Sequence, residues 1–260
     1  MPDSEQRANE KRIFPDLLKY VGDDSEKLNE PLTGFLGMQG RLATGELAVI
    51  GRSPNQWLNE GWTAEEMCDE KNHQAVLEKT LVESLLETDR PCPLLWVTDC
   101  WAGGRGNMGR TAFWRVVRSV MDNMGIADVL KSDWPSHLMW TNLYKIAPAK
   151  GWNPSVRLCD VQFEFCVQIL REEFLWWKPK RALFLTGWGR AKHFLTRFQT
   201  AQWKDVEEKK FVEWVGTADF EPSHRVQIVV AKHPMGKPEG RLVAEIVGAF
   251  NLIEERVAQR

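Results

Sequence analysis

The chain has 260 residues, of which 43% are hydrophobic, and its formal net charge is −2. This length and composition suit one sizeable hydrophobic core and exclude a largely disordered chain. The five cysteines form no C-x-x-C pair, which argues against a disulfide framework or a closed zinc site. No apolar run reaches the roughly 18 residues of a membrane span, so we expect a cytoplasmic protein without a membrane partner.

The first 30 residues are rich in acids and predict a loosely packed lead-in, followed by a single domain over residues 31–260. Four short apolar runs in that domain predict buried strands. Each run is rich in large or branched apolar residues and is too short for a helix. These runs are Leu47–Gly51, Leu138–Leu143, Ala182–Gly187 and Val226–Ala231.

Helical patterns separate the predicted strands. A capping box at Thr63–Glu66 predicts a helix running toward Leu86. Apolar residues at helical spacing predict three more helices, over Phe113–Met124, Cys159–Trp177 and Leu242–Ile253. Strands that alternate with helices predict an α/β fold of three αβα layers, with a central, mostly parallel four-stranded sheet.

Polar, turn-forming residues lie at the carboxyl end of each predicted strand, within its last residues or directly after it. They are Gly51-Arg52-Ser53-Pro54-Asn55, Thr141-Asn142-Leu143-Tyr144-Lys145, Thr186-Gly187-Trp188-Gly189 and His233-Pro234-Met235-Gly236. Ligands of such sheets bind beyond the carboxyl ends of the strands. The four segments therefore predict one functional site.

The order of these four endings resembles the uracil-DNA glycosylase superfamily. Gly51-Arg52-Ser53-Pro54 is similar to the first motif of that superfamily, Gly-x-x-Pro, and His233-Pro234 to its last. Thr141 to Lys145 looks closest to the Thr-Asn-x-x-Lys of the branch that carries an iron–sulfur cluster. The resemblance runs from about Leu47 to Arg241 and implies a uracil-DNA glycosylase-like fold and base excision from DNA.

The sequence departs from that branch at several positions. Ile146 stands where the branch places a cluster cysteine, and no cysteine precedes Cys68. We therefore predict no iron–sulfur cluster, no metal and no other cofactor. The variable positions of the first motif are Arg52 and Ser53, where many members carry an acid or an amide that holds the attacking water. Met235 replaces a serine that is common in the last motif.

Excision of a base requires that the base leave the stack, that its developing negative charge be stabilised, and that water reach the sugar. The resemblance implies that Asn142 reads the base and that His233 stabilises the leaving group. Ser53, Asn55 and Asp99 are candidates for positioning the water, and Trp101 and Phe113 for stacking on the base. Candidates for DNA-phosphate contacts are Gly51, Pro54, Lys237 and Arg241.

Basic residues without acids are concentrated in Phe174–Lys204 and Cys100–Met121, and further basic residues occur near the C-terminus. If these segments converge, they form a positive face that suits DNA phosphates. Each segment alone is equally consistent with solvated helix faces. The oligomeric state is left open by the sequence.

Two other functions compete with a DNA glycosylase. The first is a non-catalytic DNA-binding protein on the same fold, favoured by the lack of an acid in the first motif. The second is a nucleotide-binding enzyme, because Gly104–Gly109 reads G-x-G-x-x-G before a helix. In the second case Thr98–Gly103 separates the motif from its strand, and Leu138–Leu143 holds no ribose-binding acid. We therefore predict no nucleotide cofactor.

Overall fold

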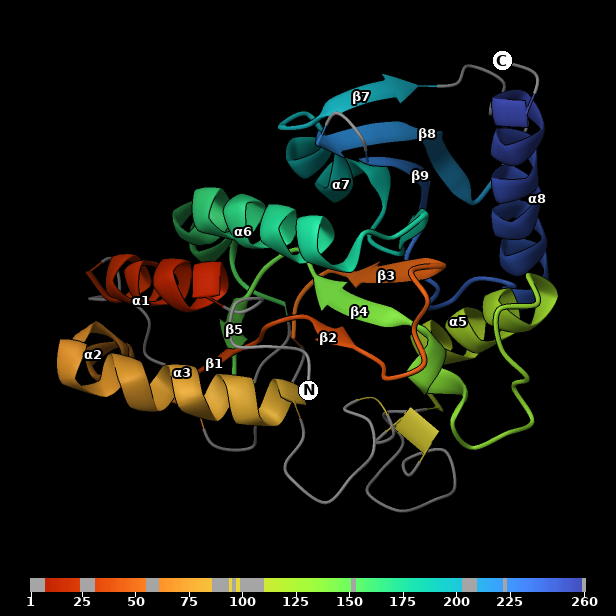
Figure 1. The fold of residues 1–260 in the computed structure, drawn as a ribbon. Helices are drawn as coiled ribbons and strands as arrows, with labels where there is room; N and C mark the ends of the chain where they lie inside the picture. The colour runs from red at the N-terminus through yellow and green to blue at the C-terminus, as the bar shows by residue number, and fades with distance from the viewer. Residues whose placement is uncertain are drawn as a thin grey trace. The chain divides into compact units, whose positions relative to one another are not determined.

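The computed structural model describes residues 8–23, 31–54, 61–85, 94, 97–98, 110–150, 153–202, 210–221 and 224–258 (Figure 1). In this part the chain is mixed α/β, which confirms the predicted class. It divides into two compact units that alternate along the sequence. The first comprises Met1–Gly37, Gly51–Glu87 and Thr141–Trp176, and the second comprises Met38–Ile50, Thr88–Trp140 and Trp177–Arg260.

The first unit is mostly helical. It contains α1 (Ala8–Asp23), α2 (Ala64–Cys68), α3 (Glu70–Leu85) and all but the last residue of α6 (Val156–Trp177). Strands β1 (Leu32–Gly34) and β5 (Ile146–Pro148) form a separate antiparallel pair, in which Gly34 lies opposite Ile146. Apolar side chains from these elements meet in one buried core.

Helix α1 corrects the prediction of a loosely packed lead-in. Its side chains Phe14, Leu17, Leu18 and Val21 are fully buried in the core of the first unit. Their i, i+3, i+4, i+7 spacing places them on one face of the helix. Burial of each such side chain contributes roughly 1.5–3 kcal/mol, so this part of the N-terminal segment belongs to the packed unit.

The predicted capping box at Thr63 is confirmed. The Thr63 hydroxyl accepts from the Glu66 N–H at 3.1 Å, and the Glu66 carboxylate accepts from the Thr63 N–H at 2.7 Å. The predicted single helix toward Leu86 is nevertheless two helices, because Asp69 has an extended backbone. The Asp69 carboxylate accepts from the Lys71 N–H at 3.0 Å and so begins α3 as a capping group.

A seven-stranded mixed sheet lies almost entirely in the second unit. Its order is β2 (Met38–Gln39), β4 (Met139–Asn142), β3 (Leu47–Gly51), β6 (Arg181–Phe184), β9 (His224–Ala231), β8 (Val212–Glu221) and β7 (Gln199–Gln202). Strands β3, β6 and β9 are parallel, whereas β2, β8 and β7 pair antiparallel with their neighbours. The four predicted strands are β3, β4, β6 and β9, so the sheet is larger and more mixed than predicted.

Helices of the second unit pack on this sheet and on one another. They are α5 (Ala112–Asn123), the short 3-10 helix η3 (Trp134–His137), α7 (Trp188–Leu195) and α8 (Glu239–Ala258). Helix α5 ends before Gly125, whose φ is +63°, as predicted. Four consecutive residues of β9, from Ile228 to Ala231, are fully buried, so both faces of that strand are covered. No helix in the described ranges is long and apolar enough to cross a membrane.

Gly216 occupies a position in β8 that no side chain can fill. A Cβ placed there would lie 2.2 Å from the Ala201 carbonyl oxygen of β7 and 2.6 Å from the indole of Trp214. That indole stacks on Trp188 at the start of α7, with ring centroids 5.5 Å apart and planes 5° from parallel. The close approach of β7 and the position of the Trp214 indole therefore both require glycine at 216.

Candidate functional site

The residues that follow β4 lie beside the residues that follow β3 in the first unit. The Leu143 N–H donates to the Gly51 carbonyl at 2.9 Å, and the Tyr144 N–H donates to the Arg52 carbonyl at 3.0 Å. Two of the four predicted polar endings are therefore joined by backbone hydrogen bonds. This contact fixes the main chain immediately after Asn142.

Asn142 is the last residue of β4 and is 2% exposed. Its Nδ2 amide group is buried and has no hydrogen-bond partner among the described residues. Buried polar groups in folded proteins are nearly always paired, and an unpaired donor costs about 1–3 kcal/mol. An amide left in this state is available to a ligand that presents a hydrogen-bond acceptor.

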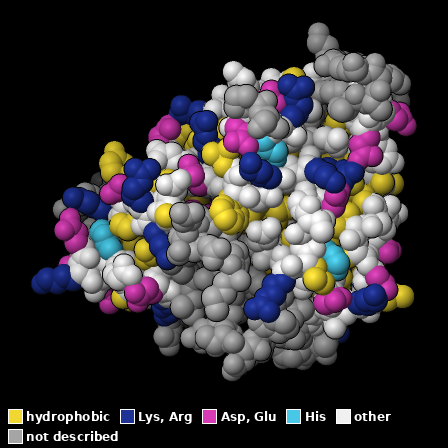
Figure 2. Space-filling model, in the orientation of Figure 1, with side chains coloured by type: hydrophobic (Ala, Val, Ile, Leu, Met, Phe, Trp, Pro, Cys, Tyr) yellow, Lys and Arg dark blue, Asp and Glu magenta, His cyan; other side chains and the backbone are white. Residues whose placement is uncertain are grey.

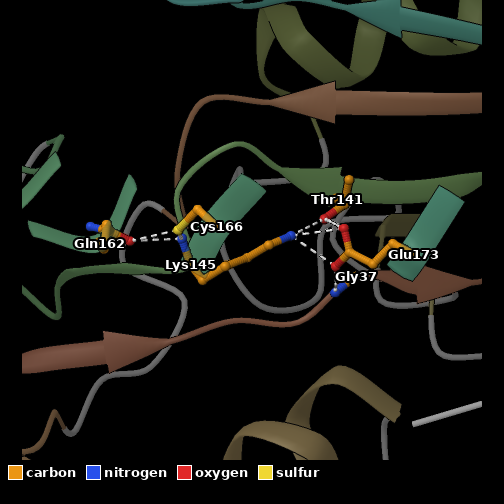
Figure 3. Close-up of polar contacts among 6 residues, drawn as sticks. All are labelled: Gly37, Thr141, Lys145, Gln162, Cys166 and Glu173. Atoms are coloured by element: carbon orange, nitrogen blue, oxygen red, sulfur yellow. Dashed lines mark hydrogen bonds and ion pairs between the residues drawn. The ribbon is translucent and has the colours of Figure 1, made fainter. Parts of the chain in front are cut away.

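A fully buried ion pair flanks Asn142. The Lys145 Nζ lies 2.8 Å from both carboxylate oxygens of Glu173, and both residues are 0% exposed. The Lys145 Nζ also donates to the Thr141 Oγ1 at 2.6 Å, and the Thr141 hydroxyl donates to Glu173 at 2.8 Å. The Gly37 N–H completes the set by donating to Glu173 at 2.8 Å (Figure 3).

Gln162 of α6 holds the main chain at the other end of the Lys145 side chain. Its Oε1 accepts from the N–H groups of Lys145 and Ile146, at 2.9 and 2.8 Å. Its Nε2 donates to the Ile146 and Leu158 carbonyls, at 2.8 and 3.0 Å. The Cys166 thiol also donates to the Gln162 Oε1, and burial raises the pKa of this thiol to about 12 (Figure 3).

Ile146 stands where the iron–sulfur branch places a cysteine, and its surroundings suit an apolar side chain. It lies in β5, is fully buried, and belongs to the core of the first unit. The described residues contain no group of three or more His, Cys, Asp or Glu placed to hold a metal ion.

The described part of the first motif is a bend, and its Ser53 side chain makes a polar contact. Gly51 and Pro54 are buried, and the Ser53 hydroxyl donates to the Asn153 Oδ1 at 3.4 Å. The Ser53 proton is used in this hydrogen bond, so the hydroxyl oxygen can make a further hydrogen bond only as an acceptor. Asn55, the next candidate for holding water, lies outside the described residues.

The segment after β9 in the second unit is a tight turn around His233. The Met235 N–H donates to the His233 Nδ1 at 3.2 Å, and the Lys237 N–H donates to the Pro234 carbonyl at 3.0 Å. Because Nδ1 accepts, the neutral imidazole carries its proton on Nε2, where it is a donor. Gly236 has a φ of +71°, and the Met235 side chain at the tip of the turn is 68% exposed.

The other described candidates also lie in the second unit. Phe113 is half-buried near the start of α5, where its ring meets Trp114 edge-on with centroids 5.2 Å apart. Arg241 of α8 is exposed, but its Nε donates to the Glu245 Oε1 at 3.3 Å and its guanidinium lies over the Phe211 ring. Lys237 is partly exposed in the turn before α8.

Seven basic residues of the three predicted positive segments are paired with acids. On the face drawn in Figure 2, Lys and Arg side chains are dispersed and lie next to Asp and Glu. In the second unit these pairs are Arg115–Glu239, Lys178–Glu221, Lys180–Glu46, Arg181–Glu254, Arg225–Asp219, Lys232–Glu213 and Arg241–Glu245. The Arg115 guanidinium lowers the pKa of Glu239 by hydrogen bonding. These pairs reduce the positive charge that the segments offer to phosphates.

Glu245 links Arg241 to the backbone, and this contact predicts a pH dependence. Burial raises the pKa of Glu245, but N–H donors from Phe211, Val212 and Lys210, together with Arg241, outweigh it and lower the pKa. A carboxylate with a lowered pKa stabilises the fold above its unfolded value of about 4.3, and the contribution is lost as the pH falls through the folded value.

We therefore expect the free energy of unfolding of Glu245→Gln to fall less steeply than that of the wild type as the pH decreases below about 4.3. Urea unfolding at a series of pH values measures this, with Glu255→Gln, an exposed position on the same helix, as the control. Equal slopes for Glu245→Gln and the wild type would contradict the assignment.

Three further predicted residues, Asn55, Asp99 and Trp101, lie outside the described residues, as does the Gly104–Gly109 motif. The structure brings Gly51 and Ser53 next to the Asn142 segment in the first unit, and His233 and Lys237 into one turn in the second. The polar partners of the Asn142 segment were not predicted, namely Glu173 and Gln162 on α6.

No protein-family model matches the chain, and no curated protein matches it in sequence.

Proposed function

We propose that the protein is a monofunctional DNA glycosylase that extrudes a uracil or related modified base and hydrolyses its N-glycosidic bond. The observation that carries this proposal is the buried Asn142 amide at the end of β4, whose Nδ2 has no partner among the described residues. Nδ2 is a donor and the amide oxygen is an acceptor, so the group matches the alternating acceptors and donors on the edge of a pyrimidine.

The segments at the ends of the predicted strands support the same proposal. Numbered along the chain, the four predicted strands lie in the order second, first, third, fourth, as β4-β3-β6-β9. The Gly51–Pro54, Asn142 and His233 segments each lie at the end of one of these strands, and their order along the chain is the basis of the resemblance to the uracil-DNA glycosylase superfamily. We propose a three-layer, uracil-DNA glycosylase-like architecture around the parallel strands, in a protein that acts in the cytoplasm without a nucleotide or metal cofactor.

The chemistry assigns each group one task. Water adds its hydroxyl to the sugar C1′ as the bond to the base breaks. The bonding electrons leave with the base, and the proton that the water releases neutralises the departing base anion. Asn142 holds the base edge, and the Nε2–H of His233 donates to the oxygen on which negative charge develops. Gly51, Pro54, Lys237 and Arg241 contact phosphates, Phe113 and Trp101 contact the base, and Ser53, Asn55 or Asp99 orients the water.

Incubation with oligonucleotides tests the proposal. Substrates that carry a single uracil, deaminated purine or modified cytosine are treated with alkali, which cuts the strand at an abasic site. We expect cleavage on one class of base, and its loss in His233→Ala. Absence of abasic sites from every substrate, at enzyme concentrations that saturate the DNA, would refute a glycosylase.

A non-catalytic DNA-binding protein is the second candidate. It is favoured by the first motif, in which none of the described residues 51–54 is acidic and the Ser53 hydroxyl is directed to Asn153. A binder of this kind retards the oligonucleotides in a gel but releases no base, so the same samples distinguish the two functions.

A further inference from the structure

The Lys145–Glu173 pair is too costly to be explained by stability alone. Both side chains are 0% exposed. Removing two charges from water is expensive, and apolar residues of similar size often stabilise a core equally well or better. A buried pair of this kind is best explained by what it holds in place.

The network around this pair uses every polar group that it contains. The three protons of the Lys145 ammonium meet three acceptors, which are the Thr141 Oγ1 and the two oxygens of Glu173. The Glu173 carboxylate accepts two further hydrogen bonds, from Thr141 and from the Gly37 N–H. A network in which every donor is used has one favourable geometry, so it is rigid.

This rigid network holds the chain on both sides of Asn142. Thr141 precedes Asn142, and Lys145 follows three residues later. The N–H groups of four consecutive residues, 143 to 146, are also bound, the first two to the carbonyls of Gly51 and Arg52 and the last two to Gln162. Adjacent side chains of a strand point to opposite faces, so Thr141 is held while the Asn142 amide is directed elsewhere.

We infer that Thr141, Lys145 and Glu173 are positioning residues that fix the Asn142 side chain in one orientation. Their network anchors the backbone around Asn142 but leaves its Nδ2 without a partner among the described residues. The inference deepens the proposed function, on which it rests, because it names the device that presents the base-reading amide before DNA arrives. A preoriented donor needs no reorganisation when the base enters.

The test uses a neutral version of the pair, Lys145→Met/Glu173→Gln. The glutamine side chain retains an acceptor for the Gly37 N–H and a donor for Thr141, so the variant is designed to fold. Asparagine-selective ¹⁵N labelling, with Asn142→Ala to assign the signal, gives the heteronuclear NOE of the Asn142 side-chain amide. We expect an NOE near that of the backbone in the wild type and a clearly lower one in the double variant.

The control is Leu18→Ala, which removes buried side-chain volume from the core of the first unit. It should lower stability while leaving the NOE of Asn142 unchanged. A double variant with the wild-type NOE would overturn the inference, and so would an equal loss of NOE in Leu18→Ala.

The kinetics of base release provide a second measurement, which tests the proposed function separately from the positioning role. In the double variant we expect kcat for base release to fall about 100-fold, while KM for the oligonucleotide changes less than about threefold. If the wild type releases no base, the proposed function fails, but the NOE comparison still decides whether the network positions Asn142. If both proteins release base equally and both amides are rigid, the function stands and the positioning role fails.

Discussion

Replacing Lys145 alone with methionine is expected to lower the free energy of unfolding by about 3–5 kcal/mol. The reason is that Glu173 is fully buried, so its carboxylate would stay in the core without the ammonium that lies 2.8 Å away. The hydrogen bonds from Thr141 and Gly37 would remain, but they do not replace the counter-ion of a charge that has lost its interaction with water. Few single substitutions on the described residues leave a charge so completely enclosed.

Urea unfolding of four proteins measures this effect, namely the wild type, Lys145→Met, Glu173→Gln and the double variant. We expect each single variant to be much less stable than the wild type, and the double variant to recover part of the loss because no charge remains unpaired. Additive losses in the double variant would show that the two side chains do not interact, contrary to the structure.

The second large effect concerns Asn142 and separates activity from stability. Asn142→Ala should reduce kcat/KM for base release by about 100-fold or more, since a donor to the reacting base is lost. Its free energy of unfolding should change by less than about 1 kcal/mol. The small cavity destabilises the variant, but removal of a buried donor that lacks a partner among the described residues offsets this.

The measurement compares base release and thermal unfolding on the same preparations. Asn123→Ala is the matched control, because Asn123 is an exposed residue at the end of α5 whose amide donates to the Ser119 carbonyl. It should retain full activity. A large loss of stability in Asn142→Ala, with base release intact, would mean that Asn142 supports the fold and not the reaction.

The fold could be predicted from the sequence where burial leaves a local pattern. Strands β3, β4, β6 and β9 are short apolar runs because they are buried on both faces, and such runs are visible without a structure. Strand β7 was missed because all four of its side chains, Gln199 to Gln202, are exposed. It forms a strand by pairing with β8, and its own four residues show no alternation of apolar and polar side chains that would predict one.

Helix α1 was missed as a packed element for a different reason. Its acidic and basic residues dominate the composition of the N-terminal segment, while its buried face consists of only a few apolar positions. Average composition hides such a stripe, and a count at i, i+3, i+4 spacing over residues 13–21 would have revealed it.

The candidate site was predictable only in part. Asn142 and His233 were predicted by their place after a strand and by the resemblance to a known family. Glu173 was not, because it lies 28 residues from Lys145 and no short-range pattern connects the two. A signal did exist, since Glu173 falls on the apolar stripe of α6 between Leu170 and Trp177, and Lys145 falls within a buried run. Charges at two core positions predict a pair.

The close approach at Gly216 has a consequence for how related sequences can differ. The outer strand β7 exposes all of its side chains, so its residues can be exchanged with little effect on packing. The inner strand β8 has one position that is closed to every residue except glycine, because the Ala201 carbonyl and the Trp214 indole occupy the space. We therefore expect related sequences to vary freely at the positions of β7 and to keep glycine at the position of Gly216.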